Sequence, residues 1–257
     1  TSLGALPGPG EVWTQFVALM GEHADARAEA AALVAAGGTW SGAPTFVDQI
    51  YTSLQTAALG FILATVVAVP LGLVAGMSKR ANAAINPLIQ VMRPISPLAW
   101  LPIVTMVVSA SITSADPWLQ KSFVISAITV MLCSLWQTLI NTAVGVASID
   151  KDLLNVGKVL RLSWFSRLTK LVLPSAMPYI FTGMRLSLGV GWMVLIAAEM
   201  LAQNPGLGKF VWDEFQNSND RSLARIMVAV VVIGLIGFAL DKIMGTAQAI
   251  VAKRMGN

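Results

Sequence analysis

Residues 54–77, LQTAALGFILATVVAVPLGLVAGM, form an uninterrupted apolar stretch that ends at Ser78, Lys79 and Arg80. A helix needs about 20 mainly apolar residues to cross the hydrocarbon core of a bilayer, so this stretch can span a membrane. Four further stretches have the same character, at residues 94–112, 123–146, 178–201 and 226–250. Because none alternates apolar and polar residues as barrel strands do, the sequence predicts an all-α, polytopic membrane protein with five visible spans.

The composition agrees with this class and excludes several others. Of the 257 residues, 56% are hydrophobic and 12% are charged, about half the charged share of a soluble domain. A single cysteine, Cys133, excludes an intramolecular disulfide, and a single histidine, His23, leaves too few ligands for zinc or bis-histidine haem sites. The chain also lacks a Gly-x-x-x-x-Gly-Lys-Ser/Thr loop, so it is not expected to bind ATP. We expect no cofactor, metal or nucleic acid to bind this chain.

The first 51 residues differ from the rest, which divides the chain into an N-terminal segment, 1–51, and a transmembrane domain, 52–257. The segment contains five acids and one base, and its Ala-rich run at 22–36 predicts a short helix ended by Gly37 and Gly38. Basic residues concentrate after the first and third stretches and in the tail, so the positive-inside rule predicts a cytoplasmic C-terminus and an extracytoplasmic segment 1–51. Because the chain begins with Thr1, we expect a further span, giving six, or a cleaved signal before it.

Two stripes of small residues indicate close helix packing. In the first span small residues fall four apart, and the fourth span repeats the pattern; the positions are Gly60, Ala64, Ala68, Gly72 and Gly76, then Gly183, Ser187 and Gly191. Small side chains let helix backbones approach closely in a membrane. Packing of helices within the chain is the favoured interpretation. The alternative is that the stripes let helices slide past one another or pack at the interface of a dimer.

The segment 148–174, between the third and fourth spans, is amphipathic. Its apolar residues recur at intervals of three and four and are interrupted by Lys158, Arg161, Arg167 and Lys170. We expect Pro174 and Pro178 to stop this helix where the chain re-enters the membrane. The periodicity is equally compatible with a helix on anionic lipid and with a docking site for a cytoplasmic protein.

Charged and polar residues inside the spans are the candidates for a translocation pathway, because they are costly there and usually face protein or water. Arg185 could attract an anion or form a salt bridge, and Glu199 could pair across helices or touch an outside partner. Trp100 could gate the path or pack, whereas Gln137 and Asn141 could line it or bond a neighbouring helix. Asp241 and Lys242 are expected to mark the inner end of the last span. The complete candidate set is Arg93, Ser96, Trp100, Gln137, Asn141, Arg185 and Glu199.

Several segments resemble the permease subunits of ABC importers. The cytoplasmic loop signature of these permeases is Glu-Ala-Ala, three residues, Gly, nine residues, Ile, one residue, Leu-Pro. Counting back from Leu173 and Pro174, Leu171 takes the Ile place, Arg161 the Gly place, and 155–157 the Glu-Ala-Ala place. Residues 93–103, RPISPLAWLPI, and 174–185, PSAMPYIFTGMR, are similar to the nitrate, bicarbonate and sulfonate branch, and the nitrate permease subunit is the nearest member.

The resemblance implies a MetI-like, type I importer permease that moves nitrate, with nitrite as an alternative, across the bacterial inner membrane. It implies a second permease copy, two ATPase subunits that bind ATP and Mg, an extracytoplasmic substrate-binding protein, and contact with membrane lipid. It also implies a coupling helix on the ATPases, with the contact residues Asp150, Asp152, Leu153, Asn155, Val156, Gly157, Lys158, Arg161, Leu162 and Ser163. The chain itself would not be an enzyme.

Other functions remain open from the residues. Bicarbonate, cyanate, taurine or an alkanesulfonate could replace nitrate within the same importer class. A secondary transporter would need inverted repeats, and the sequence shows no convincing repeat. A membrane-embedded enzyme would need a cluster of histidines or carboxylates, which is absent from the sequence.

Overall fold

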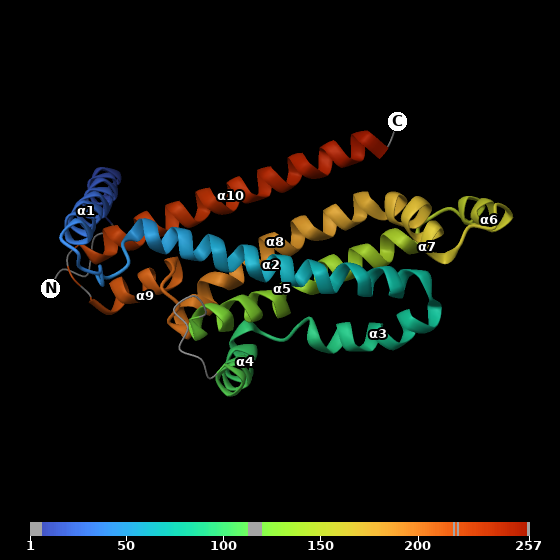
Figure 1. Cartoon of the computed structure of the whole chain (residues 1–257), viewed down its shortest axis with the longest axis horizontal. Coiled ribbons are helices and arrows are strands. Elements are labelled where there is room, and N and C mark those ends of the chain that lie inside the picture. The colour runs from blue at the N-terminus through green and yellow to red at the C-terminus, as the bar shows by residue number, and fades with distance from the viewer. Residues whose placement is uncertain (1–6, 113–119, 218, 220, 256–257) are drawn as a thin grey trace.

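The computed structural model describes residues 7–112, 120–217, 219 and 221–255, and its regular structure within these ranges is entirely helical. The long helices run along one axis and form a bundle (Figure 1). In chain order the elements are α1 Pro9–Ala35, α2 Phe46–Met77, α3 Lys79–Met92, α4 Pro97–Ser111, α5 Lys121–Ala147, α6 Lys151–Val159, α7 Trp164–Arg167, the π-helix η1 Leu168–Val172, α8 Leu173–Ala202, α9 Leu207–Asn217 and α10 Ser222–Met255.

Helix α5 lies at the centre of the bundle and packs along both α2 and α8. On the α2 side, Ala64 and Ala68 are fully buried, and an added Cβ at Gly72 would lie 2.6 Å from the Cβ of Thr142. On the α8 side, Ser187 Oγ donates a hydrogen bond of 2.7 Å to the carbonyl oxygen of Ser134. Both stripes of small residues therefore serve helix packing within the chain.

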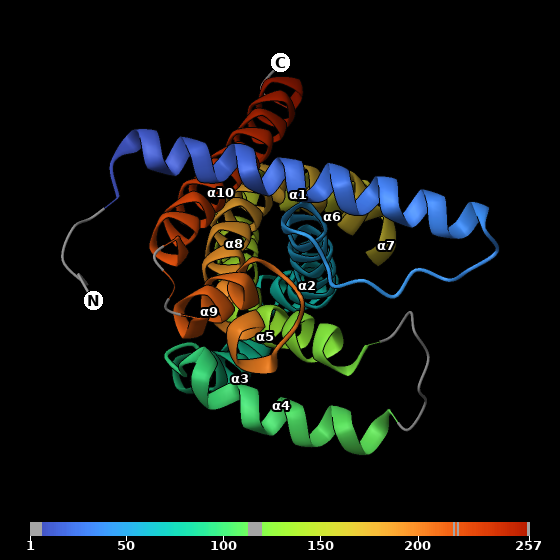
Figure 2. The same cartoon turned by 90° about the vertical axis from the view of Figure 1, so that its left-hand side faces the viewer.

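The predicted second span is not a straight transmembrane helix. Helices α3 and α4 are bent by 103° at a break of four residues, and α4 lies across the bundle (Figures 1 and 2). Arg93 keeps helical backbone angles at the end of α3, Ser96 is extended, and Pro97 then starts the new helix α4. At 15 residues, α4 is about 22 Å long, shorter than the roughly 30 Å hydrocarbon core. The prediction of a single span at 94–112 is therefore wrong. The described helices give four candidate spans, or five if this bent pair is one broken span.

The prediction that Pro174 and Pro178 stop the loop helix is also wrong. Helix α7, η1 and α8 continue into one another, so that Trp164–Ala202 is a single helical segment. The π-turn η1 precedes Pro174, which lies in the first turn of α8, where a missing N–H is tolerated. Pro178 lies inside α8 without ending it. A rod of this kind can connect the α6 end of the bundle directly to its opposite end.

Helix α1 crosses the end of the bundle opposite α6, nearly perpendicular to the long helices (Figure 2). It begins at Pro9, well before the predicted start near residue 22, and ends as expected, with Gly37 at a φ of +81°. The positive φ is easily adopted by glycine, and the Gly38 amide donates to the carbonyl oxygen of Leu33 to close the helix end. The N-terminal segment is thus a long helix rather than a short one.

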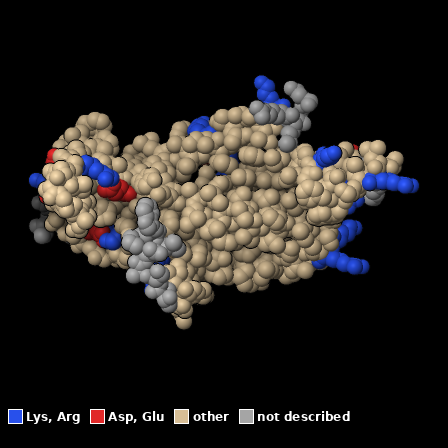
Figure 3. Space-filling view, in the orientation of Figure 1, with Lys and Arg blue, Asp and Glu red and all other residues tan. Residues whose placement is uncertain are grey.

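The remaining elements complete the two ends of the bundle. Helix α9 follows the end of α8, and its Leu207 and Phe210 are buried. Helix α10 continues past Asp241 and Lys242 to Met255, so these two residues do not end it. On the face shown in Figure 3, most Asp and Glu side chains lie at the α1 end, and several Lys and Arg side chains project from the α6 end. A broad, mostly uncharged band separates the two ends, as expected for a membrane-spanning bundle.

Candidate functional site

The α6 end of the bundle contains the residues predicted to contact an ATPase. Asp150 precedes α6, and its Oδ1 accepts a hydrogen bond of 2.9 Å from the Asp152 amide. Gly157 is buried on the opposite face of this short helix, and an added Cβ there would lie 2.7 Å from Leu171 Cδ1. The close approach of Gly157 to Leu171 therefore joins α6 to the rod that contains α8.

A tight turn at Arg161 links α6 to α7. Arg161 has a φ of +49°, and the Leu162 amide donates to the Gly157 carbonyl oxygen at 3.0 Å. This six-residue closure, with a left-handed residue just before the donor, is the Schellman motif that commonly ends helices. Ser163 then caps α7, because its Oγ accepts from the Ser166 amide at 3.2 Å. Arg161 occupies the glycine place of the loop signature, and its backbone has the conformation that favours glycine.

The turn exposes several large apolar side chains at this basic end. Their exposed fractions are 64% for Leu160, 59% for Trp164 and 67% for Phe165, and Val159 and Leu153 are also exposed. We call these five residues, Leu153, Val159, Leu160, Trp164 and Phe165, the loop patch. Asp152 and Asn155 are exposed beside it, whereas the side chains of Val156 and Lys158 lie outside the described part of the structure. An apolar patch of this kind needs a partner or a lipid surface to cover it.

The charged residues of the α8 span have separate partners. Arg185 forms a bidentate ion pair with Asp241 of α10, in which Nε donates to Oδ1 and Nη2 to Oδ2, both at 2.7 Å. A hollow of about 210 Å³ adjoins this pair between α8 and α10. The structure thus contains the salt bridge that was one of the two interpretations of Arg185. The partner of Arg185 is Asp241, which was expected from the sequence only to mark the inner end of the last span.

Glu199 is fully buried among α2, α8 and α9. Ser53 Oγ lies 2.9 and 2.8 Å from its two carboxylate oxygens, and the Gly208 amide donates to Oε2 at 3.0 Å. Ser53 Oγ also accepts from the Leu207 amide at 2.8 Å, so both polar groups are satisfied. Glu199 therefore pairs across helices, as one interpretation held, and its burial removes it from any surface that an outside protein could touch in this conformation.

The candidates around the α3–α4 break are dispersed. Arg93 is the exposed residue at the end of α3, and Ser96 caps α4 by accepting from the Leu98 amide at 3.3 Å. Trp100 is half-buried and lines an apolar hollow of about 170 Å³ between α4 and α5, and its buried Nε1 has no hydrogen-bond partner among the described residues. Trp100 therefore packs against α5 in this state, and no described contact joins it to Arg185.

Gln137 and Asn141 both lie on the half-buried face of α5. Asn141 Nδ2 donates to the Gln137 carbonyl oxygen at 2.8 Å, a bond within the same helix. The backbone of Gly183 in α8 packs directly over both residues. Of the two interpretations of Asn141, a bond to a neighbouring helix is not made by Nδ2, because the i−4 carbonyl within α5 is the nearer acceptor, and a role in lining the pathway stays a prediction.

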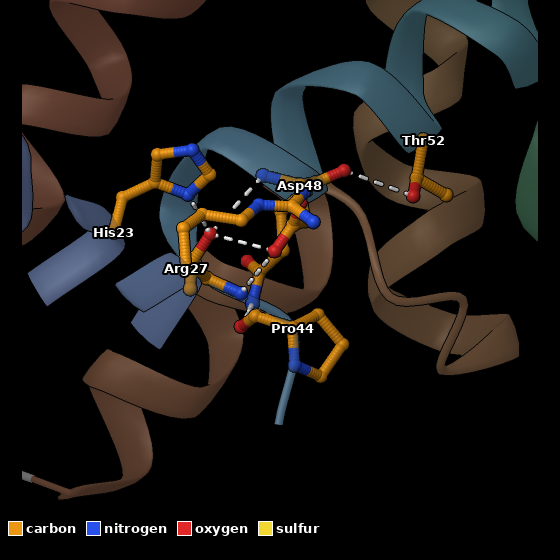
Figure 4. Close-up of polar contacts among 7 residues, drawn as sticks. His23, Arg27, Pro44, Asp48 and Thr52 are labelled. Carbon is orange, nitrogen blue, oxygen red and sulfur yellow. Dashed lines mark hydrogen bonds and ion pairs between the residues drawn. The ribbon is translucent and has the colours of Figure 1, made fainter. Parts of the chain in front are cut away.

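Polar contacts hold α1 against the bundle at two places. At one, His23 Nδ1 lies 2.6 Å from Thr45 Oγ1, and Arg27 forms an ion pair with Asp48 at the start of α2 (Figure 4). Thr45 and Asp48 also form a capping box at the start of α2. At the other, Arg225 of α10 pairs with Glu22 of α1 and with Glu214 of α9. Helix α1 is thus part of the folded end and not a loose extension.

Three residues of these networks were not among the predicted site residues. Asp241 was recognised as a charge in an apolar stretch, which was a sufficient signal, but its partner lies 56 residues away. Ser53 lies 146 residues from Glu199, and one serine among many carries no sequence signal. Arg225 joins α1, α9 and α10, and one arginine near the start of a span carries no signal of these partners.

Residues 68–257 match the family model described as binding-protein-dependent transport system inner membrane component. The chain is 38% identical over 204 residues to the nitrate import permease protein NrtB of Synechococcus elongatus, covering 79% of this chain and 69% of that protein. It is 36% identical over 208 residues to the bicarbonate transport system permease protein CmpB of the same organism, covering 80% of this chain and 70% of that protein. It is 29% identical over 193 residues to the putative aliphatic sulfonates transport permease protein SsuC of Bacillus subtilis, covering 75% of this chain and 65% of that protein.

Solved structures share the fold at low sequence identity. The MetNI methionine ABC transporter in inward-facing conformations superimposes with a TM-score of 0.66 at 13% identity, covering 80% of this chain and 95% of that one. An amino acid ABC transporter crystallised with histidines gives a TM-score of 0.58 at 13% identity, covering 81% and 93%. At this identity the likeness concerns the fold alone.

Proposed function

The chain belongs to the family of inner membrane components of binding-protein-dependent transport systems, and on that basis we propose that it conducts nitrate into the cell as a permease subunit. The predictions of an ABC importer permease and of its MetI-like helical fold are confirmed. As a permease of this class it is a non-catalytic, multi-pass subunit, and ATP hydrolysis is carried out by partner ATPases. The transported ion, the contacts with partners and the orientation are parts of the proposal.

Nitrate is supported by the similarity to nitrate import permeases at 38% identity over most of the chain. Bicarbonate is the second candidate, because bicarbonate permeases are 36% identical over a similar length. Both ions are small monoanions with three oxygens, so one pathway chemistry can serve either of them. The discrimination between them would then rest with the binding protein that delivers the ion.

The loop patch is the proposed contact with the ATPase. It is large, apolar and exposed, and it lies at the basic end of the bundle, which the positive-inside rule places in the cytoplasm together with the C-terminus. A lipid surface is a poorer partner, because α6 extends beyond the end of α2 along the bundle axis (Figure 1). The predicted coupling residues from Asp150 to Ser163 would surround this contact.

The connection from the loop patch into the bundle suggests how ATPase motion is transmitted. Trp164 and Phe165 start the rod that continues through η1 and α8 to Ala202, and Gly157 fixes α6 against the same rod at Leu171. Because α8 is packed tightly against α5, a displacement of the loop patch would move these helices as one rigid unit.

The assembly that we propose contains two copies of this chain, two ATPases that bind ATP and Mg, and an extracytoplasmic binding protein that docks at the α1 end. The pathway between the two copies would include the membrane-embedded candidates, of which Arg185 is the one with an anion-binding group. Glu199 would stabilise the outer end from within rather than line the path.

The experiment is co-purification of the ATPases with variants of this chain. Phe165→Glu places a charge in the loop patch, and Trp13→Glu is the matched control at the α1 end, since the two side chains are 67% and 65% exposed. We expect Phe165→Glu to lose the ATPases and Trp13→Glu to retain them. Equal retention by both variants would contradict the proposed contact, and failure of the unaltered chain to bind any ATPase would contradict the function.

A further inference from the structure

The Arg185–Asp241 pair combines full charge pairing with exposure. Its side chains are 43% and 47% exposed, and the hollow beside it is lined by Arg185, Leu188, Gly189, Trp192, Leu240 and Asp241. The hollow of about 210 Å³ is several times the roughly 30 Å³ that a water molecule occupies in the liquid. A small anion with part of its hydration shell therefore fits beside the guanidinium.

The pair lies toward the inner end of α8 and α10. Arg185 lies about 26 Å along the axis from the end of α8 at Ala202, so in a hydrocarbon core roughly 30 Å thick it lies near the inner interface. Half-exposed charges at this level usually face water, protein or an aqueous cavity. A second polar contact follows on the same seam, where Gln248 donates to Thr182 Oγ1 at 2.8 Å. The contact between α8 and α10 therefore contains two polar pairs among mainly apolar residues.

The guanidinium retains unused hydrogen-bonding capacity. Arginine has five N–H donors, and Asp241 accepts from Nε and from Nη2 only. Nη1 has no hydrogen-bond partner among the described residues. The bidentate geometry that a carboxylate adopts on arginine is equally available to another planar group with two oxygens and one negative charge.

We propose that Arg185 is a binding site for a planar, trigonal monoanion on its way through the membrane, and that Asp241 is the internal competitor that releases it. The anion takes over the guanidinium from Asp241 on arrival, and Asp241 takes it back as the anion leaves. The anion gains the bidentate pair that Asp241 loses, and the released Asp241 carboxylate must be solvated by water in the hollow, so the gain and the cost are nearly balanced. This balance is what conduction requires, because a site that binds its ion tightly cannot pass it on.

The proposal rests on the function proposed above and narrows its substrate class. Nitrate and bicarbonate are planar and can present two oxygens in the plane of the guanidinium, as Asp241 does. A sulfonate can also present two oxygens to a guanidinium, as tetrahedral phosphate does, but its third oxygen and its organic group project out of that plane. Nitrate and bicarbonate therefore fit in the plane occupied by the Asp241 carboxylate, whereas an alkanesulfonate needs additional space beside it.

The first test is anion uptake by the reconstituted complex with Asp241→Asn. An asparagine keeps the shape but competes poorly for the guanidinium, so we expect KM for nitrate and kcat both to fall by at least about threefold. A pair that only joined two helices would leave KM unchanged or raise it. A KM that does not fall therefore overturns the proposal.

The second test is the double variant Arg185→Leu/Asp241→Leu, which removes both charges and leaves neither unpaired. We expect nitrate uptake to fall at least about tenfold in complexes whose assembly is verified by co-purification of the ATPases. Uptake at the unaltered rate would overturn the anion site while leaving the proposed function intact. A complex with unaltered residues that transports neither nitrate nor bicarbonate would instead overturn the function.

A third measurement does not depend on charge removal. Gly189→Cys, in a Cys133→Ala background, introduces a thiol into the hollow at a position where an added Cβ has no neighbour within 4 Å. We expect a membrane-impermeant, water-soluble thiol reagent to label it in the assembled complex, and nitrate to slow the labelling. Leu235→Cys, on the exposed apolar face of α10, is the control. No labelling at position 189 would overturn the proposal of a wet, anion-accessible seam.

Discussion

Replacement of Gly72 by alanine is expected to separate α2 from α5. The new Cβ would lie 2.6 Å from Thr142 Cβ, 2.8 Å from the Leu139 carbonyl oxygen and 2.9 Å from Thr142 Cγ2. Ordinary van der Waals contact begins near 3.4 Å, so the two backbones must move apart by about 0.8 Å. The Leu139 oxygen belongs to the backbone of α5 and cannot rotate away.

The cost follows from the packing on either side of this contact. Gly60 and Gly76 are as close to α5 as Gly72 is, so a local displacement loosens the whole stripe. Overpacking of a well-packed interface costs typically 1–3 kcal/mol. We therefore expect Gly72→Ala to lower the free energy of unfolding by about 2 kcal/mol.

The assay is reversible unfolding of the purified chain in mixed micelles by increasing SDS, followed by circular dichroism. Gly234→Ala is the matched control, because it also lies within a candidate span but an added Cβ there has no neighbour within 4 Å. Its stability should stay unchanged or rise by up to roughly 1 kcal/mol, since alanine favours helix more than glycine does. A Gly72→Ala chain at least as stable as the unaltered one would refute the packing argument.

Three further predictions concern the polar contacts and the α6 turn. Glu199→Leu leaves the buried Ser53 hydroxyl and Gly208 amide without their acceptor, so it should lower the free energy of unfolding by about 2–4 kcal/mol in the same assay. Glu199→Gln should lower it less, and equal effects of the two variants would contradict this expectation. Arg161→Gly replaces an arginine in the left-handed backbone conformation by a glycine, so it should stabilise the turn by about 1 kcal/mol. The measurement is amide exchange at Leu162, which should become slower, and faster exchange would count against the turn assignment. Arg225→Met should speed amide exchange in α1 about fivefold, equivalent to ~1 kcal/mol, without affecting α5; unchanged exchange in α1 would exclude the clamp.

Much of the helical framework was predictable because it depends on local patterns. Apolar length alone located α2, α5, α8 and α10, and the spacing of small residues correctly indicated which faces pack closely. The end of α1 at Gly37 was also predictable, because a glycine with positive φ commonly follows a helix. These features need no knowledge of distant residues.

The errors arose where several local signals compete or where the partner is remote. Pro94 and Pro97 lie at the break between α3 and α4, whereas Pro174 lies in the first turn of α8 and Pro178 inside it, and the helix continues past both. Hydropathy does not reveal that difference. The start of α1 was missed although Val12, Phe16, Leu19 and Met20 recur at helical spacing and pack into the core.

The candidate site shows the same division. Arg185 and Glu199 were identified as costly charges in apolar surroundings, but their partners Asp241 and Ser53 are distant in sequence. Energy considerations predict that a buried charge has a partner, and only the fold shows which residue it is. The loop patch was predictable as an amphipathic segment, whereas its exposure became evident only from the turn at Arg161.

The decisive measurement is nitrate-dependent ATP hydrolysis and uptake by the complex of this chain, its ATPases and its binding protein in liposomes. Bicarbonate and taurine serve as comparison substrates, and Asp152→Lys/Gly157→Trp is the uncoupled control. We predict that nitrate stimulates hydrolysis and accumulates inside, and that the control abolishes both effects. Stimulation by taurine but not by nitrate would contradict the planar-anion assignment, and no stimulation by any substrate would contradict the importer function itself.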